Sequence, residues 1–226
     1  YVSYVDKESE KRVVAALKAL LPEAGFIVEE GSAVYRDEPY CWVIDPLDGT
    51  TNYIHDEAPY CVCIALRSRT ELLLGVVYEV CRDECFCAWR GGRAFMNGEE
   101  IHVSGVRDIK DAFVFAELPY NAQQYKQTAL HLIDKLYGVV GGIRMNGSAA
   151  AAICYVAMGR FDAWAEAFLG KWDYSAAALI VQEAGGRVTD FCGNGHFMDG
   201  HHIIATNGYL HSVYQQLIAE VPPLDM

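Results

Sequence analysis

The sequence lacks an apolar run long enough to cross a membrane, a signal-peptide pattern, an internal repeat, a low-complexity tract and a linker. It also lacks a basic surplus, because 18 Lys and Arg stand against 30 Asp and Glu, a formal net charge of −12. Sequence-independent nucleic-acid binding needs a basic surface, so this charge disfavours both nucleic acid and the membrane surface as partners. The chain begins at Tyr1 rather than Met, and we expect a preceding segment. Together these features indicate a cytoplasmic protein.

Cys-x-x-Cys pairs and zinc-type histidine spacing are absent as well, although the chain has eight cysteines and seven histidines. Most of the cysteines lie within apolar segments of strand-like or helical pattern, such as Cys61, Cys63 and Cys154. Free cysteine in a cytosolic protein usually packs as a small apolar residue. We therefore expect reduced, buried thiols rather than disulfides or a zinc site.

What the chain does have is 226 residues with 52% hydrophobic content, enough for one large domain or two lobes. Hydrophobic periodicity predicts helices over residues 6–21, 123–137, 148–158, 173–183 and 209–219. It predicts strands over residues 26–28, 41–44, 60–66, 72–80, 84–89, 114–116, 161–165, 187–190 and 203–206. An antiparallel half followed by an α/β half predicts an N-terminal lobe over 1–108 and a C-terminal lobe over 109–226, meeting at a cleft.

The most informative segment is residues 42–52, which read WVIDPLDGTTN. Asp45 and Asp48 lie three residues apart around Pro46, directly after an apolar strand. Proline removes a ladder donor and fixes φ, so we expect the strand to end here and both carboxylates to lie on an irregular turn. Such turns commonly bind hard cations and phosphate groups. If the ligand of this acidic chain is an anion, a bound divalent metal is the simplest way to reverse the local charge.

Further acidic residues stand at the ends of expected elements: Glu29 and Glu30 after a strand, Glu166 after a strand and Asp173 just before a helix. Each of them alone is explained equally well as a surface acid or a helix cap, and Asp6 and Asp173 are both placed to be N-caps. Their joint presence is what favours a functional site.

Together these segments resemble the signatures of the inositol monophosphatase family, within the lithium-sensitive, magnesium-dependent phosphatases. The matching patterns are D-P-[IL]-D-G-T-x-N at residues 45–52, G-[ST]-A-A at 147–150, W-D-x-x-A at 172–176 and E-A-G-G at 183–186. Residues 28–32 are similar to the G-E-E-S segment, with Val28 in place of glycine. The resemblance covers essentially the whole chain. It implies a homodimer and a layered αβαβα sandwich of the fructose-1,6-bisphosphatase-like carbohydrate phosphatase type, an α+β or α/β fold.

The resemblance also implies two to three Mg²⁺ ions held by oxygen ligands from Glu29, Asp45, Leu47 (main-chain oxygen), Asp48 and Asp173. Asp45 would bridge two ions, and Glu29, supported by Glu30, would help to hold a weaker third. A phosphate monoester repels nucleophiles, so metal ions must neutralise its charge and supply hydroxide near neutral pH.

The implied catalytic residues are Glu29, Thr50 and Asp6. Thr50 would orient the attacking water, with its hydroxyl paired to Asp6. In the family's D-x-x-T-x-x-D segment, Ser3 and Asp6 fit the last two anchors, while the leading aspartate and an upstream lysine would precede Tyr1. Gly49, Thr50 and Thr51 are expected to open a short helix whose free amides suit phosphate oxygens. The substrate contacts implied are Asp48, Gly49, Thr50, Thr51, Gly147, Ser148, Ala149 and Glu166, with Glu166 accepting hydrogen bonds from two alcohol groups.

Residues 51–55, TNYIH, look like the inositol monophosphatase branch. The expected function is therefore Mg²⁺-dependent hydrolysis of inositol monophosphate or a similar sugar or polyol phosphate. The enzyme alternatives are a 3′(2′),5′-bisphosphate nucleotidase and a fructose-1,6-bisphosphatase, because a metal site that grips phosphate discriminates weakly among leaving groups. The alternative from another class is a non-catalytic member that acts through a partner, as some bacterial relatives do with transcription machinery.

Overall fold

The computed structural model describes residues 3–119, 122–195 and 197–219. One sheet has the strand order β1-β2-β3-β4-β5-β6-β7 and a second the order β11-β12-β10-β8-β9. The first sheet consists of β1 (Gly25–Val28), β2 (Tyr40–Asp48), β3 (Cys61–Ser68), β4 (Leu72–Glu79), β5 (Glu84–Trp89), β6 (Ala94–Met96) and β7 (Glu99–Glu100). The second consists of β8 (Phe113–Ala116), β9 (Gly142–Arg144), β10 (Ala163–Ala167), β11 (Arg187–Asp190) and β12 (His202–Thr206).

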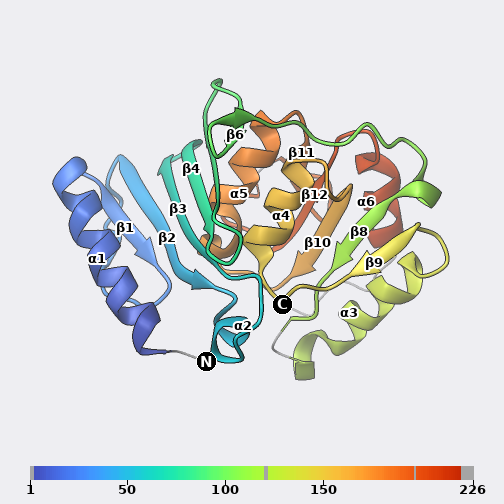
Figure 1. Ribbon diagram of the computed structural model, residues 1–226, viewed down its shortest axis with the longest axis horizontal. Coiled ribbons are helices and arrows are strands. Elements are labelled where there is room, and N and C mark those ends of the chain that lie inside the picture. The colour runs from blue at the N-terminus through green and yellow to red at the C-terminus, as the bar shows by residue number, and fades with distance from the viewer. Residues whose placement is uncertain (1–2, 120–121, 196, 220–226) are drawn as a thin grey trace.

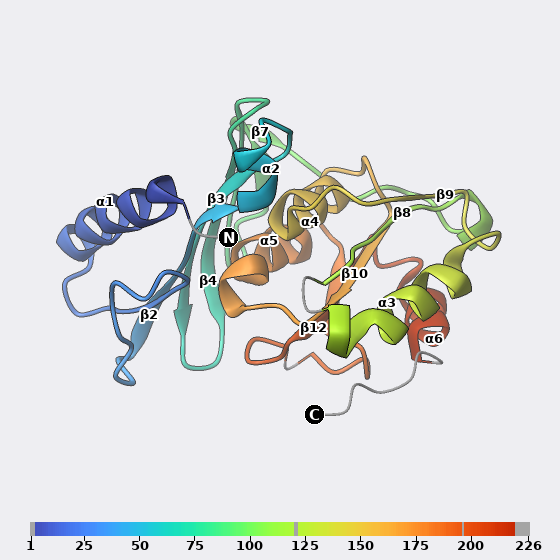
Figure 2. The same cartoon turned by 90° about the horizontal axis from the view of Figure 1, so that it is seen from below.

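The helices form three further layers around these sheets (Figure 1). They are α1 (Tyr4–Leu20), α2 (Thr50–Ile54), α3 (Ala122–Leu136), α4 (Ala149–Ala157), α5 (Lys171–Glu183) and α6 (His211–Ala219), with a 3₁₀ turn, η1 (Ile109–Asp111). Helix α1 covers the outer face of the first sheet, α4 and α5 lie between the sheets, and α3 and α6 cover the outer face of the second (Figures 1 and 2). This order of layers confirms the predicted αβαβα sandwich.

Three apolar clusters fill the spaces between these layers. The central cluster joins residues of both halves, including Val43 and Phe86 from the first sheet and Trp164 from the second, around the buried helix α4. Helix α1 packs on the first sheet through Leu17, and α6 packs on the second through Tyr214. Because the central cluster is shared, the division into lobes at residue 108 stays a prediction.

Strand β2 does not end at Ile44 as predicted. It runs on to Asp48 through a bulge, because Asp45 pairs with Cys63 and Asp48 pairs with Cys61, so that β2 has one residue more than β3 over this stretch. A bulge leaves a residue outside the ladder, which accommodates a proline that cannot donate a hydrogen bond. The two carboxylates therefore lie within a bulged strand end rather than on a turn beyond it.

The bounds of two helices and one strand also differ from the prediction, and the difference changes where Asp6, Asp173 and Glu166 lie in these elements. Ser3 is the N-cap of α1 and Gly170 is the N-cap of α5, so the prediction of Asp6 and Asp173 as N-caps is wrong. Each lies at the third position of its helix and accepts a hydrogen bond from the N-cap backbone amide, and at Ser3 the serine side chain completes a capping box. Strand β10 extends to Ala167, so Glu166 lies inside it, paired with Ile203, and not after it.

The structure shows all eight cysteines as free thiols, of which Cys81 and Cys192 are exposed rather than buried. None of the helices in the described ranges is long and apolar enough to span a membrane.

Candidate active site

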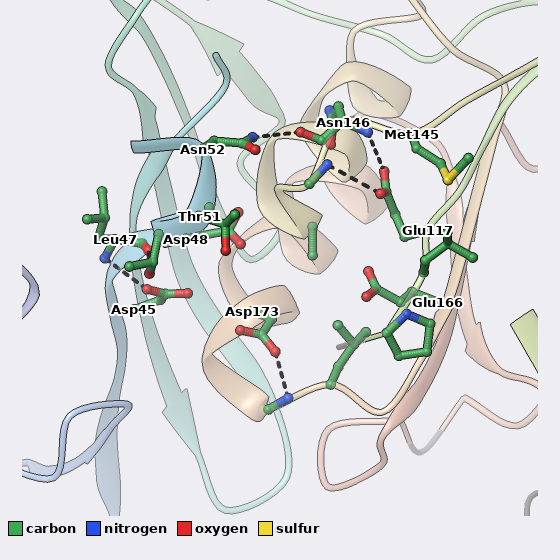
Figure 3. A pocket seen from close by; sticks show the side chains of 18 of the residues that line it. Asp45, Leu47, Asp48, Thr51, Asn52, Glu117, Met145, Asn146, Glu166 and Asp173 are labelled. Atoms are coloured by element: carbon green, nitrogen blue, oxygen red, sulfur yellow. Dashed lines mark hydrogen bonds between the residues drawn. The ribbon is translucent and has the colours of Figure 1, made fainter. Parts of the chain in front are cut away.

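A cavity of about 740 Å³ opens between α2, the end of β2, and the segments that follow β8, β9 and β10 (Figure 3). Its wall carries seven carboxylates: Glu29, Asp45, Asp48, Glu57, Glu117, Glu166 and Asp173. No Lys, Arg or His is among the described residues that line it. The cavity therefore combines strong negative charge with hard oxygen ligands.

Asp45, Asp48 and Asp173 form the densest part of this wall, with carboxylate oxygens that all lie within 4.8 Å of one another. Asp45 and Asp48 come from the bulged end of β2 and are 1% and 7% exposed, while Asp173 enters from the first turn of α5. Glu29 follows β1, which runs parallel beside β2, and reaches the same place from the exposed lip of the cavity. Hard divalent cations prefer such a set of oxygen donors.

Backbone groups hold these carboxylates in position. The Leu47 amide donates to Asp45 Oδ1 over 2.9 Å, and the Gly170 amide donates to Asp173 Oδ2 over 2.7 Å (Figure 3). Asp48 Oδ2 accepts from the Ala150 amide at 2.9 Å and from the Ser148 hydroxyl. Since each carboxylate has only part of its accepting capacity filled, oxygen lone pairs remain for a cation.

The electrostatics of the cluster favour neutralisation. Burial raises the pKa of Glu29 to about 7 and that of Asp48 to about 6. Burial also raises the pKa values of Asp45 and Asp173 well above their ordinary range, with further contributions from the neighbouring carboxylates. Like charges that are held together out of water cannot all ionise, so the site requires either protons or cations.

Thr50 and Asp6 lie beside the cluster. The Thr50 hydroxyl is 3.1 Å from Asp6 Oδ1 and 3.0 Å from the Leu47 carbonyl oxygen, and its one proton can serve only one of them at a time. Asp6 is fully buried and also accepts from the Ser3 backbone amide at 2.7 Å. Gly49 precedes Thr50 at φ +91°, and a Cβ there would lie 2.9 Å from the Pro59 carbonyl oxygen, so this turn requires glycine.

The opposite side of the cavity holds Glu117 and Glu166 (Figure 3). Glu117, which follows β8 and is 6% exposed, accepts from the amides of Asn146 at 3.0 Å and Gly147 at 3.3 Å. Within the described part of the chain no group donates a hydrogen bond to Glu166, so its oxygens face the cavity unengaged. Burial raises the pKa of Glu166, and the nearby charge of Glu117 adds to this.

Asn52 joins the two sides. Its Nδ2 donates to the Pro59 carbonyl oxygen at 2.8 Å and to the Asn146 carbonyl oxygen at 2.7 Å, which ties α2 to the segment before α4 (Figure 3). Neither Glu117 nor Asn146 was predicted from the sequence. Glu117 carries the same signal as Glu29, an acid directly after an apolar strand, whereas nothing in the sequence marks Asn146.

Most of the predicted site residues line this one cavity: Glu29, Asp45, Leu47, Asp48, Gly49, Thr50, Thr51, Gly147, Ala149, Glu166 and Asp173. Ser148 lies behind the wall, 1% exposed, against Asp48. Asp6 is reached only through Thr50, and Glu30 is outside the described lining. Glu30 is placed by a residue that was not predicted, the fully buried Glu10, whose Oε2 accepts from the Glu30 amide at 2.8 Å.

The fold and the site together define a five-layer α/β protein with a carboxylate cluster suited to divalent cations. The inositol monophosphatase family model matches residues 1–223, and the chain belongs to that family.

Individual relatives agree with this assignment. The chain is 40% identical to the Nus factor SuhB of Pseudomonas aeruginosa and 36% identical to an inositol-1-monophosphatase of Mesorhizobium japonicum. In both cases the similarity covers 92% of this chain and 78% of the relative. The inositol monophosphatase of Anabaena (Nostoc) sp. PCC 7120 is similar in structure, with a TM-score of 0.92, 32% identity, and coverage of 97% of this chain and 87% of that one.

Proposed function

We propose that the protein is a Mg²⁺-dependent phosphomonoesterase that hydrolyses inositol monophosphate or a similar sugar or polyol phosphate. The observation that carries this proposal is the composition of the cavity wall, with seven carboxylates and no basic side chain among the described lining residues. Such a wall repels a phosphate ester unless cations reverse its charge, and it has the oxygen ligands that Mg²⁺ requires.

The donor set fits two magnesium ions. Asp45, the most buried of the cluster, would hold both ions, one of them together with Glu29 and the Leu47 carbonyl oxygen and the other together with Asp48 and Asp173. Glu29, with Glu30 in support, would contribute to a third ion. When bound, the ions neutralise the phosphate and lower the pKa of a water molecule enough for it to attack near neutral pH.

Thr50 positions the attacking water in this proposal. If the Leu47 carbonyl oxygen held a cation, the Thr50 hydroxyl would donate to Asp6 Oδ1, and its own lone pairs would be free to accept a hydrogen bond from the water. Asp6 is fixed at the start of α1 by its capping box, so it holds the Thr50 hydroxyl in one orientation. The residues of the turn from Gly49 to Thr51 line the cavity, and in this proposal their backbone amides hold the phosphate oxygens.

The alcohol part of the ester is assigned to the opposite side of the cavity. Glu166 accepts hydrogen bonds from its hydroxyl groups, and the segment from Gly147 to Ala149 forms the adjoining wall. Ser148 contributes by donating to Asp48 from behind the wall.

A phosphate-release panel tests this function. Turnover of inositol 1-phosphate, adenosine 3′,5′-bisphosphate and fructose 1,6-bisphosphate is compared in Mg²⁺ and in Mg²⁺ plus Li⁺. Preference for inositol 1-phosphate, with inhibition by Li⁺, supports the proposal. Preference for one of the bisphosphates would instead identify the protein as the corresponding enzyme alternative. No phosphate release from any monophosphate with ample Mg²⁺ would refute the proposed function.

The 40% identity to a protein named as a Nus factor favours a second candidate, a role that depends on a binding partner. The two candidates are separated by an Asp45→Asn variant in a cell that depends on this protein. Loss of both turnover and the cellular role supports the enzyme, whereas loss of turnover with the role intact supports the partner-dependent function.

We further propose that the protein is a cytoplasmic homodimer, as its resemblance to the inositol monophosphatase family implies. Sedimentation equilibrium tests the assembly, and a monomer across micromolar concentrations would refute it.

A further inference from the structure

Three exposed apolar side chains line the cavity outside the carboxylate cluster. Leu118, Met145 and Phe168 are 48%, 53% and 49% exposed, and all three line the cavity. Figure 3 places Met145 beside Glu117, across the cavity from Asp45. Single exposed apolar residues are ordinary, but three that line one cavity beside seven carboxylates indicate a ligand with an apolar part.

Phe168 is the most informative of the three because of its backbone. Its φ is +65°, in the left-handed region that favours glycine and disfavours bulky residues. Along the chain it lies between Glu166, which is assigned to the alcohol, and Asp173, which belongs to the carboxylate cluster, and all three residues line the cavity. A strained conformation that places an aromatic ring in a site is a reason to look for a function of that ring.

The neighbouring structure holds Phe168 in this conformation. Its amide donates to His202 Nδ1 over 3.3 Å, and the next residue, Leu169, donates its amide to the His201 carbonyl oxygen over 2.9 Å. The ring packs on Tyr125 of α3, with the ring centroids 4.6 Å apart at 31°. The ring is therefore supported by Tyr125, while the residue as a whole stays 49% exposed and lines the cavity.

We propose that Phe168, with Leu118 and Met145, determines specificity by binding a flat ring in the alcohol part of the substrate. The inference rests on the proposed phosphatase function and narrows its substrate class. The preferred substrate is a phosphate monoester whose alcohol has a ring with an apolar face, in addition to hydroxyl groups that reach Glu166. A cavity of about 740 Å³ has room for such an alcohol, since ligand pockets usually measure about 300–1,000 Å³.

Matched ligand pairs test the proposal. The substrates are 3-phenylpropyl phosphate and propyl phosphate, which release nearly the same alkoxide, so a difference in turnover between them reports binding of the ring. The proteins are the wild type, Phe168→Gly, Phe168→Ala and Phe168→Tyr. Leu130→Ala serves as the control, because Leu130 is an exposed residue of α3 that does not line the cavity.

The wild type should favour the phenyl substrate by about tenfold in kcat/KM, mainly through KM. The Gly and Ala variants should lose this preference, so that their ratio of kcat/KM values for the two substrates falls to about one. The Tyr and Leu130→Ala variants should keep it. Phe168→Gly should also unfold at a higher temperature than Phe168→Ala, because glycine relieves the left-handed conformation.

Binding of 3-phenylpropylphosphonate and propylphosphonate in Mg²⁺ separates failure of this inference from failure of the proposed function. If the wild type hydrolyses neither phosphate but binds the phenyl phosphonate more tightly through Phe168, the phosphatase function fails and the ring site stands. Equal affinity for the two phosphonates, including no binding of either, overturns the ring site. The ring site is also overturned if Phe168→Gly keeps the preference for the phenyl ligand, or if a changed oligomeric state is the only effect of that substitution.

Discussion

The two sides of the cavity are built differently. On the cation side, Asp45, Leu47, Asp48 and Thr50 come from six consecutive residues at the junction of β2 and α2, and backbone amides fix the carboxylates. On the side proposed for the alcohol, which we call the alcohol side, the lining comes from three segments: one after β8, one after β9, and the end of β10 with the residues that follow it. The first two are joined by the hydrogen bond from the Asn146 amide to Glu117.

This difference indicates which side of the cavity is rigidly placed and which side can vary in sequence. A bulged strand that continues directly into a helix leaves little freedom, which suits a set of ligands that must meet at one ion. Three separate segments can change one side chain without moving the others, which suits recognition of different alcohols.

Asp45→Asn should nearly abolish phosphate release, by about a thousandfold in kcat/KM, because it removes the central charge of the cation side. The amide oxygen can still accept from the Leu47 amide, so the bulge should stay folded. Glu57→Gln is the matched control, since Glu57 lines the cavity but is outside the cluster, and it should lower turnover less than about threefold. Turnover of Asp45→Asn above a tenth of the wild-type rate would contradict the assignment.

Thr50→Ala should lower kcat by about a hundredfold, because a positioned hydroxyl that directs the attacking water is lost. Thr50→Ser keeps the hydroxyl and should retain activity within a few-fold. Steady-state kinetics in saturating Mg²⁺ decides between these outcomes. Equal losses in the Ala and Ser variants would show that the threonine methyl group, and not the hydroxyl, matters.

The metal-free protein should become less stable as pH rises from about 4.5 to 7. Burial raises the pKa of Glu29 from 4.5 to about 7, so the folded state binds more protons than the unfolded chain across this window. Mg²⁺ needs the deprotonated carboxylates, so the increase in Tm that it causes should grow over the same window. Thermal unfolding from pH 5 to 8, in EDTA and in Mg²⁺, measures both trends. A Mg²⁺ effect that is independent of pH would count against these carboxylates as ligands.

Glu117→Gln should have the smallest effect, about 1–2 kcal/mol in the free energy of unfolding, because one of the two accepting oxygens becomes a donor that faces a backbone amide. KM should rise a few-fold, since the Asn146 segment loosens, while kcat stays near the wild-type value. Urea unfolding and steady-state kinetics test the two parts. A large loss in kcat with KM unchanged would mean that the two sides of the cavity are not separable.

The contrast between the two sides also explains how much the sequence could predict. That Asp45, Asp48 and Asp173 line one cavity was predictable because they stand in short, contiguous motifs, and the αβαβα layers followed from the same resemblance. The bulge in β2 was not, because pairing with Cys61 and Cys63 of β3 decides whether a strand continues past Pro46. The predicted starts of α1 and α5 are two residues late, because the prediction makes Asp6 and Asp173 N-caps, whereas each accepts from the amide of an N-cap three residues earlier.

On the alcohol side, Glu166 was predicted by resemblance. Met145 and Phe168 were not predicted, because they line the cavity only where segments that are distant in the sequence come together. Phe168 was the least predictable, since a left-handed backbone at a phenylalanine runs against local preference.

The most direct test of the central claim is a calorimetric titration of Mg²⁺ into the metal-free wild type and the Asp45→Asn variant at pH 8, without substrate. We predict more than one bound ion per wild-type chain and the loss of most of this binding in the variant, because Asp45 is surrounded by the other carboxylates of the cluster. Mg²⁺ binding that is absent from the wild type, or equal in the two proteins, would contradict the account.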